Sequence, residues 1–495
     1  MKRILSITFC SLVMAGTSAR AQFAEDVLRF SQFNVGVGAR SLGMGNVGIG
    51  LADDYSSLFR NPAGLALVRD NEFSIGLSQT NYKNDVSFYG SNVQANLNSL
   101  NLNNLGLVYP IATVRGSLTF GIGFARIANY STTASFDGFN PRSSILESLT
   151  PNVNVRTMTA ADRRDLLDNN IPFQIYLADT AGGTLFPAVI DSVQQKGTTE
   201  EGGGINNWSL GGAVDIARNI SIGGSVNILS GSYRYDREYN EFDSRNLYTY
   251  TRRVYSIDTE AFKRFTYTSS VASDISGFNA LFGIMIRKQG LYKIGATVRT
   301  PTYYEISENF SDEGESEFDA NANGVIDIFR LSSSGSNKYE VRTPPILSVG
   351  GSFQVRDWLV IAGDAEYTDW TQMEFTGDNA AYLEENRLIK KIYQPTTNLR
   401  GGAEVSLWDI GLQLRGGVVW NPSPYKDDPP EFNQLYYTGG IGFRLDENVF
   451  LNTAFAYGKW TTVRDNYYLS GLTNPSRTSE AVKQSNLNVT LSYRF

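Results

Sequence analysis

The sequence lacks histidine and is poor in cysteine and proline. Its 495 residues include no His, one Cys and 15 Pro. Without imidazole, the chain cannot build a Ser/His/Asp triad, a histidine metal site or the commonest general base. The absence leaves Ser/Lys and carboxylate-pair enzymes open, but nothing in the sequence points to one, so we expect no enzyme activity. The formal net charge of -7 argues against a nucleic-acid partner, because binding to phosphates needs a basic surface.

The N-terminus has the form of an export signal. Lys2 and Arg3 precede an apolar stretch, and residues 19–21 read Ala-Arg-Ala, the small-residue pattern of a signal-peptidase site. We therefore expect residues 1–21 to be a signal peptide and the mature chain to begin at Gln22. The single Cys10 lies within the signal, so the exported chain would contain no disulfide.

The remaining chain is dominated by residues that alternate between apolar and small or polar. No later run approaches the roughly 18 apolar residues that a membrane-spanning helix needs. In residues 207–217, Trp208, Leu210 and Val214 share one face, and Ser209 and Asp215 share the other. Period two predicts β-strands, although alternation alone does not separate a membrane barrel from a soluble sandwich.

Three further features favour a transmembrane barrel. The last residues alternate perfectly and end on Phe495, which is similar to the closing strand of an outer-membrane barrel. Short connections at 217–219, 288–290 and 356–357 contrast with long polar segments. Aromatic residues at the expected strand ends fit interfacial girdles: Trp358, Tyr367, Trp370, Trp420, Tyr436, Tyr437, Tyr457 and Trp460.

The pattern therefore predicts an all-β, transmembrane antiparallel β-barrel over residues 72–495, with residues 22–71 as a plug in its lumen. Fifteen spans read as strands, and an even number near fourteen is expected because bacterial single-chain barrels have even counts. Residues 128–206, 232–274 and 301–342 are expected to be large extracellular loops. Within the first, Thr159 predicts a helix start, and Pro187 is a second candidate start. The strand spans expected are 72–80, 86–95, 104–110, 115–127, 207–217, 219–231, 275–288, 291–300, 346–356, 358–368, 397–407, 410–420, 435–445, 448–458 and 485–495.

The plug segment is rich in glycine. Residues 43–48 match the G-x-G-x-x-G pattern of dinucleotide loops, but no β-branched strand leads into them, so this interpretation is weak. Residues 38–66, "GARSLGMGNVGIGLADDYSSLFRNPAGLA", resemble the N-terminal hatch of FadL-type outer-membrane transporters, including the tripeptide Asn61-Pro62-Ala63. Residues 343–375 and 435–458 resemble later strands of that family. Asn46 and Val47 depart from its pattern, and the long loops do not match it.

The resemblance implies a location in the outer membrane of a Gram-negative bacterium and passive uptake of hydrophobic molecules such as long-chain fatty acids. The ligand would leave sideways through the wall into outer-membrane lipid, because an apolar molecule gains nothing from a water-filled channel. An alternative is a FadL-like barrel that acts as a docking subunit of an outer-membrane protein complex. A continuous apolar path through the lumen would distinguish transport from docking.

The resemblance and the plug's composition together single out a small set of ligand-binding or hatch residues. Pro62 restricts the backbone and Gly64 frees it, as a movable plug segment would require, although Asn61 to Gly64 could equally be a rigid turn that seats the plug. The set comprises Phe23, Gly43, Met44, Gly45, Asn61, Pro62, Ala63 and Gly64.

A second candidate site lies in residues 319–327. Asp319, Asn321, Asn323 and Asp327 are spaced like the oxygen ligands of an EF-hand loop, with Gly324 at the sharp turn. Position twelve is Arg330, where a bidentate acid is expected. The pattern therefore predicts either a Ca²⁺ site or an acidic, solvated loop tip.

Overall fold

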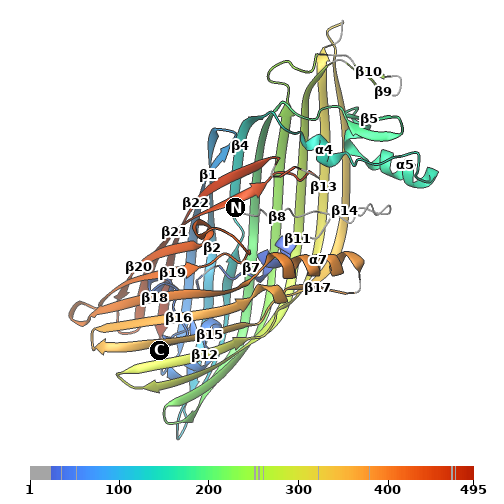
Figure 1. Cartoon of the computed structure of the whole chain (residues 1–495). Coiled ribbons are helices and arrows are strands. Elements are labelled where there is room, and N and C mark those ends of the chain that lie inside the picture. Colours follow the sequence, from blue (N-terminus) through green and yellow to red (C-terminus); the bar gives the residue numbers. More distant parts are fainter. Residues whose placement is uncertain are drawn as a thin grey trace.

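The chain forms a closed antiparallel barrel of fourteen strands that surrounds an N-terminal helical segment (Figure 1). This computed structural model describes residues 24–34, 36–51, 53–249, 252–254, 257–259, 261–320, 323–377, 379–469, 472–473 and 475–495. β1 pairs along its whole length with β22, and Phe495 exchanges backbone hydrogen bonds with Asn71, so the last strand closes the barrel as expected. In the described part of the chain, no helix is long and apolar enough to cross a membrane.

The wall strands follow one another around the barrel in chain order. They are β1 (Glu72–Phe88), β2 (Ser91–Ile111), β3 (Leu118–Asn129), β7 (Val193–Ala217), β8 (Ile220–Phe242), β11 (Phe262–Lys288), β12 (Tyr292–Arg299), β15 (Ile346–Arg356), β16 (Leu359–Asp369), β18 (Pro395–Leu407), β19 (Leu412–Asn421), β20 (Gln434–Arg444), β21 (Val449–Asp465) and β22 (Arg477–Arg494). Three further strands extend wall strands beyond a break: β4 (Thr132–Asn140) follows β3, β13 (Tyr303–Ala320) follows β12, and β14 (Ile326–Arg342) precedes β15.

The shorter elements lie inside the barrel or above it. The N-terminal segment contains α1 (Ala24–Ser31), α2 (Ala39–Gly43), α3 (Ser57–Arg60) and the 3-10 helix η1 (Pro62–Leu67). The outer elements are α4 (Ile145–Leu149), α5 (Ala160–Asn169), α6 (Ile171–Gln174), β5 (Ala178–Ala181), β6 (Thr184–Pro187), β9 (Arg252–Val254), β10 (Ile257–Thr259), β17 (Glu374–Thr376) and α7 (Ala380–Ile392), with short 3-10 turns η2 (Trp370–Gln372) and η4 (Pro430–Phe432). The exception is η3 (Trp408–Ile410), which joins β18 to β19 at the lower end, where the Trp408 indole N–H donates to the Asp357 carbonyl.

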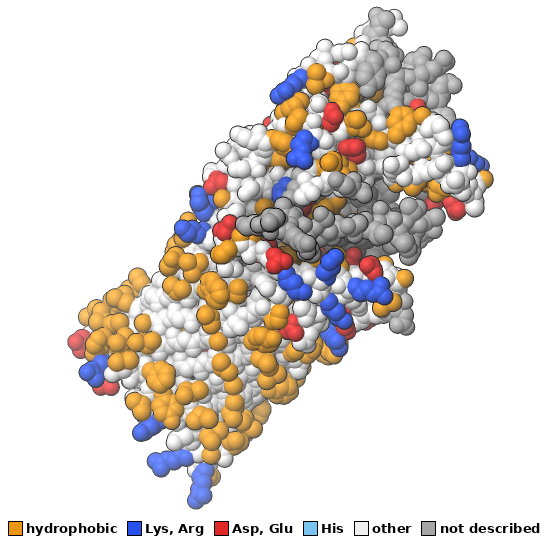
Figure 2. Space-filling model, viewed as in Figure 1, with side chains coloured by type: hydrophobic (Ala, Val, Ile, Leu, Met, Phe, Trp, Pro, Cys, Tyr) orange, Lys and Arg blue, Asp and Glu red, His pale blue; other side chains and the backbone are white. Residues whose placement is uncertain are grey.

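The apolar face of the strands points outward, and the small or polar face points into the lumen. Leu210 is 62 % exposed, whereas its neighbour Ser209 is 2 % exposed. A soluble sandwich would bury the apolar face, so this orientation identifies a membrane barrel. Figure 2 shows the apolar side chains gathered over the lower part of the molecule, with Lys and Arg at its lower end. This band is the surface that fits the hydrocarbon layer.

Several sequence predictions need correction in detail. The span 86–95 crosses the turn between β1 and β2, which accounts for the surplus fifteenth strand. Segments 232–274 and 301–342, expected as loops, consist largely of strands that prolong the wall. Thr159 does cap α5, since its hydroxyl accepts a hydrogen bond from the Asp162 N–H, whereas Pro187 ends β6 and starts no helix. Trp370 is buried in the lumen, where its indole N–H donates to Thr396, so it does not belong to a girdle.

Candidate functional site

The upper lumen holds an apolar cluster built around α1. The helix buries Val27, Leu28 and Phe30, and its first turn carries Glu25 and Asp26, which suit the positive end of a helix. The ring of Phe30 makes edge contacts with two wall tyrosines, and those two rings also contact each other. The wall and covering residues of this cluster include Ala125, Ile127, Ala128, Tyr130, Ile205, Leu229, Tyr233, Ile275, Tyr304, Ile306, Tyr339, Val341, Trp370, Met373, Phe375, Ile389 and Tyr393.

Arg29 of α1 lies among carboxylates of the helix and of the barrel wall. Arg29 forms an ion pair with Asp26, lies 3.8 Å from the Glu201 carboxylate and stacks over the Tyr233 ring at 4.3 Å. Glu201 also pairs with Arg464 on β21 at 3.3 Å. The backbone N–H of Ala24, at the start of α1, donates to a carboxylate oxygen of Glu385 on α7 at 3.0 Å. The helix is therefore anchored at its polar edge, while its apolar face lines the lumen.

The wall is interrupted beside this cluster, between β2 and β3. The ladder between these strands ends at the pair Asn104–Ala125. Beyond it, β2 continues to Ser91 and pairs only with β1, and no described residue pairs in a ladder with its other edge. The chain bends at Tyr130 and Ser131, after which β4 packs against the inner side of β1, where the Asn84 amide donates to the Thr133 carbonyl. A seam without backbone pairing results.

The plug closes this seam with a pair of reciprocal asparagine contacts, which we call the asparagine clasp. The Asn34 amide donates to the Asn129 carbonyl at 3.2 Å, and the Asn129 N–H donates to the Asn34 side-chain oxygen at 3.0 Å. From the opposite side of the seam, the Asn103 amide donates to the Gly36 carbonyl at 2.9 Å and accepts from the Gly38 N–H at 3.1 Å. Side-chain amides thus replace the ladder bonds that β2 and β3 do not make.

A bulge in β7 accommodates the bend of β3. Gly203 and Gly204 have φ angles of +95° and +156°. A Cβ on Gly203 would lie 2.1 Å from the Ser232 carbonyl oxygen, so only glycine fits there. The Gly203 carbonyl accepts hydrogen bonds from the Tyr130 N–H and from the Arg126 guanidinium. The break in β3 is therefore held in place from the β7 side.

The predicted hatch residues Gly43, Met44 and Gly45 lie against the lower wall. Met44 is fully buried, and the Gly45 N–H donates to the Thr438 hydroxyl at 2.9 Å. A Cβ on Gly45 would lie 2.5 Å from the carbonyl oxygen of Gly401. The glycines of the G-x-G-x-x-G pattern therefore allow close packing of backbone against backbone, which fits a plug in a confined space.

The wall contributes a matching set of glycine pairs that the sequence analysis missed. A Cβ on Gly50 would lie 2.4 Å from the Cα of Gly351, and one on Gly402 would lie 2.2 Å from the carbonyl oxygen of Met44. The detectable signal is a Gly-Gly dipeptide in the middle of many wall strands. These pairs are residues 211–212, 223–224, 350–351, 401–402, 416–417 and 439–440.

The structure brings Asn61, Pro62, Ala63 and Gly64 against β8, β11 and β12. The Asn61 amide donates to the carbonyls of Ile49 and Ile284, and its side-chain oxygen accepts from the Ala63 N–H. Pro62 begins η1, and Ala63 packs on Met285. These contacts describe a segment anchored to the wall. Phe23 lies outside the described residues.

An ionic cluster fastens the plug below α1. Arg40 of the plug reaches Glu404 of β18 at 2.9 Å, and Asp53 of the plug pairs with Lys293 of β12 at 2.6 Å. Arg40 and Asp53 also pair with each other at 2.5 Å. Arg415 completes the cluster at 2.7 Å from Glu404. Breaking one member would leave a buried charge uncompensated, so this part of the plug is held firmly.

The predicted calcium segment forms the tip of the hairpin between β13 and β14. Asp319 is the last residue but one of β13 and donates its N–H to the Ala261 carbonyl, and Asp327 lies in β14. Asn321 lies outside the described residues. Among those the structure describes, no three acidic or sulfur-bearing side chains are grouped as metal ligands. Calcium at Asp319, Asn323 and Asp327 therefore stays a prediction.

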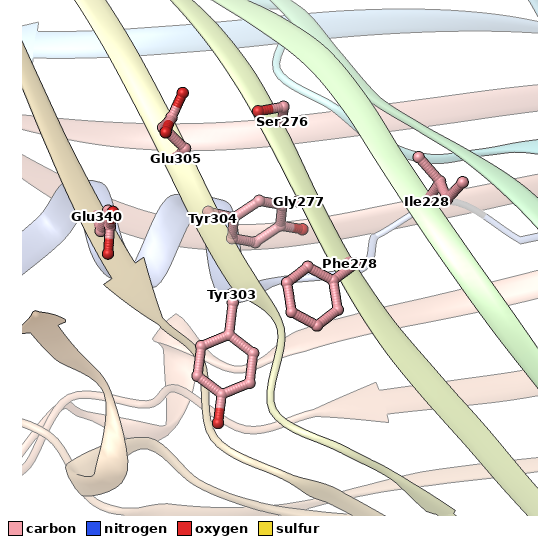
Figure 3. A pocket seen from close by; sticks show the side chains of 8 residues that line it. All are labelled: Ile228, Ser276, Gly277, Phe278, Tyr303, Tyr304, Glu305 and Glu340. Carbon is pink, nitrogen blue, oxygen red and sulfur yellow. The ribbon is translucent and has the colours of Figure 1, made fainter.

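A pocket of about 610 Å³ lies on the outward side of the wall, next to the break between β12 and β13 (Figure 3). Phe278 and Tyr303 line it with stacked rings 5.5 Å apart, and both are exposed. Glu305 and Glu340 stand on the other side of the pocket. This change from aromatic to charged residues is typical of an outer membrane interface, so it places the membrane boundary on β11 and β13.

Comparison with solved structures identifies the fold. The toluene transporter TodX of P. putida aligns with 93% of this chain and 99% of its own, with 14% identity and a TM-score of 0.54. A FadL homologue of Pseudomonas aeruginosa aligns with 94% of this chain and 99% of its own, with 12% identity and a TM-score of 0.56. The toluene transporter TbuX of Ralstonia pickettii aligns with 93% of this chain and 98% of its own, with 16% identity and a TM-score of 0.50. No family model and no curated protein sequence matches the chain.

Proposed function

We propose that this chain, which has the fold of the FadL-type barrels, imports an apolar small molecule across the outer membrane of a Gram-negative bacterium. The proposal rests on the position of Tyr130. This residue belongs to the apolar cluster around α1, and it also lies at the bend of β3, where β2 and β3 are not paired. A ligand that replaces α1 in this cluster would reach the seam without leaving apolar surroundings.

The lower plug favours a sideways exit over passage straight through the barrel. Residues 39–67 pack on wall glycines and on the cluster of Arg40, Asp53, Lys293, Glu404 and Arg415. An apolar molecule would have to displace these buried charges to pass downward. The seam beside β3 instead opens toward the lipid-facing band, into which an apolar molecule partitions by the hydrophobic effect.

The lumen also bears on the docking alternative. A docking subunit needs no apolar path, whereas this lumen gathers aromatic and aliphatic side chains around α1 from the wall strands β3, β7, β8 and β11 and from their extensions β13 and β14. Toluene transporters and a FadL homologue among the solved structures share the fold, which supports a hydrophobic small molecule as the ligand class. The proposed ligand class includes both hydrocarbons and fatty acids.

Uptake of labelled toluene and labelled oleate by cells that express the chain tests the proposal. The variant Asn34→Cys/Asn129→Cys, cross-linked by a short bis-maleimide, would lock the plug to β3. The mature chain contains no other cysteine if residues 1–21 are removed, so the cross-link is specific. Each single-cysteine variant, treated with the same reagent, is the matched control.

We expect uptake above that of cells with an empty vector, and loss of uptake only in the cross-linked double variant. Uptake that persists after cross-linking would refute the lateral exit while leaving transport intact. Equal uptake with and without the wild-type chain would refute transport. In that case, a stoichiometric protein partner that co-purifies in mild detergent would favour the docking alternative.

A further inference from the structure

β14 carries a long strand edge that faces away from its only neighbour. It pairs with β13 from Ile326 to Arg342, and its other edge pairs with β17 only at residues 340–342. Along residues 326–339, no described residue forms a ladder with that edge. β14 thus borders the tall part of the wall above the lipid-facing band (Figure 1). Unpaired backbone groups along such an edge are a template for another strand.

The pairing pattern shows which backbone groups face the open edge. Thr343 and Thr302 bond through their backbones, and hydrogen-bonded pairs alternate in an antiparallel ladder. Odd-numbered residues of β14 therefore bond to β13, and even-numbered residues face outward. The backbone N–H of Lys338, an even-numbered residue, is consistent with this assignment, because it donates to the Asn337 side-chain oxygen. Ser332, Ser334 and Ser336 each present an N–H and a carbonyl along the open edge.

This edge has few of the devices that usually protect one. Residues 326–338 contain no proline. Residues 328–342 of β14 pair in continuous register with residues 317–303 of β13. Proteins commonly blunt exposed edges with prolines, bulges or charged side chains, and of these the edge of β14 carries only the cations Arg330 and Lys338 and the register shift between Ile326 and Ile328. The smooth, serine-rich edge of β14 is therefore open to strand addition.

The side chains that border the edge define the chemistry of a partner. Arg330 and Lys338 stand on the exposed face, with side chains 64 % and 61 % exposed. Each forms an ion pair with one carboxylate of β13, from Glu315 and Glu305 respectively, and still exposes more than half of its side chain. On the opposite face, Phe329 packs on Tyr176 of the outer segment, and Leu331 lies half-buried beside it.

We propose that the edge of β14 binds an extended polypeptide segment of another protein by adding it as a strand. Only an extended backbone supplies alternating donors and acceptors at the spacing of an edge. The segment would place two carboxylates, eight residues apart, opposite Arg330 and Lys338, and apolar side chains beside Phe329 and Leu331. This interaction surface is separate from the lumen, so it does not depend on the proposed transport.

A second copy of this chain is a poorer occupant. Antiparallel pairing of two β14 edges over their full length places Arg330 opposite Ser336 or opposite the like-charged Lys338, depending on register. A register that sets Arg330 against Glu340 conflicts with β17, which already pairs at Glu340. Neither cation would gain an acidic partner, and like charges directly opposite each other are destabilising.

The test uses the purified full-length barrel in mild detergent and a capped eleven-residue peptide, VESTVTSTVES. Its two glutamates stand eight residues apart on one face, and its valines stand on the other. Fluorescence anisotropy of the labelled peptide measures the affinity for the wild type and for Ser334→Pro. Proline removes one N–H from the open edge and leaves the β13 ladder intact, because Ser334 does not bond to β13. Ser334→Ala is the matched control.

We expect Ser334→Pro to weaken binding by at least about tenfold, Ser334→Ala to bind like the wild type, and a peptide with lysine in place of both glutamates to bind worse. Equal binding by the wild type and Ser334→Pro would overturn the proposal. So would the absence of binding by a wild-type barrel that is folded, as judged by a shift in its electrophoretic mobility on heating. A dimer of the wild type that Ser334→Pro converts to a monomer would assign the edge to a second copy and overturn the choice of partner.

Discussion

Replacing Asn34 with alanine is expected to loosen the seam between β2 and β3. The substitution removes both hydrogen bonds to the Asn129 backbone, at 3.2 and 3.0 Å. A hydrogen bond contributes about 0.5–1.5 kcal/mol net. Because Asn34 is exposed and water can reach the freed groups, the two bonds together contribute about 1–2 kcal/mol. The population with an open seam should therefore rise roughly 5- to 30-fold, since 1.4 kcal/mol corresponds to a factor of ten.

Hydrogen exchange reports this opening directly. Amides in residues 126–131 should exchange faster in Asn34→Ala by the same factor, because exchange follows the free energy of local opening. Initial uptake of labelled ligand should rise in parallel if exit through the seam limits the rate. Asn98→Ala is the matched control: its side-chain oxygen accepts a hydrogen bond from the Asn81 amide on the outer strand surface, and the same change in side chain there should alter neither quantity.

Unchanged exchange at residues 126–131 in Asn34→Ala would refute the role of the asparagine clasp in closing the seam. Faster exchange without faster uptake would show that the clasp closes the seam but that another step limits transport. Asn103→Ala should have a larger effect on exchange, because Asn103 is fully buried and its loss leaves the Gly36 carbonyl and the Gly38 N–H without these partners.

Three other changes test the packing, the charge and the export of the chain. Gly50→Ala places a Cβ 2.4 Å from the Cα of Gly351, so the plug should shift and admit large antibiotics, measured as increased sensitivity; Gly202→Ala is the matched control, because its Cβ would meet no atom within 4 Å and its φ is not positive, and it should leave the barrel closed. Glu241 lies above the lipid-facing band of β8, where burial raises its pKa to about 7 despite hydrogen bonds from Ser144, Ile145 and Gln195. Since the native state then binds a proton that the unfolded state releases above about pH 4.5, attachment of residues 141–149 should weaken as pH rises from about 4.5 to 7, and limited proteolysis of Glu241→Gln should show a smaller pH dependence. The intact mass of the protein extracted from membranes should correspond to a chain that begins at Gln22, and a mass that retains residues 1–21 would contradict the signal peptide.

The architecture of the wall was largely predictable. Alternation of Leu210 with Ser209 placed an apolar face on a strand, and the lack of long apolar runs excluded membrane helices. The extent of the strands was not predictable, because β13 and β14 continue above the apolar band. There the outward face turns polar, so 301–342 looks like a loop although both strands pair with neighbours.

The candidate site was only partly predictable. The glycine-rich plug and the Asn61-Pro62-Ala63 tripeptide pointed to residues that the structure packs against the wall. The clasp was missed, since Asn34, Asn103 and Asn129 carry no local pattern. Asparagine is common in turns and on surfaces, and only their positions relative to one another give these three a shared role.

The sequence by itself determined the strand period and the inside-out distribution of apolar residues, because each depends on neighbours within a few positions of the chain; the export signal stays a prediction from the same kind of local pattern. Only the tertiary structure decided where the wall is open. The alternation of residues 118–125 breaks at Arg126 and Ile127, but a local break in period does not reveal which neighbouring strand loses its pairing beyond Ala125. That loss of pairing depends on the bulge at Gly203 in β7 and on the plug residue Asn34, which is 95 positions from Asn129 in the chain. Contacts between such distant segments form only when the plug is enclosed by the barrel.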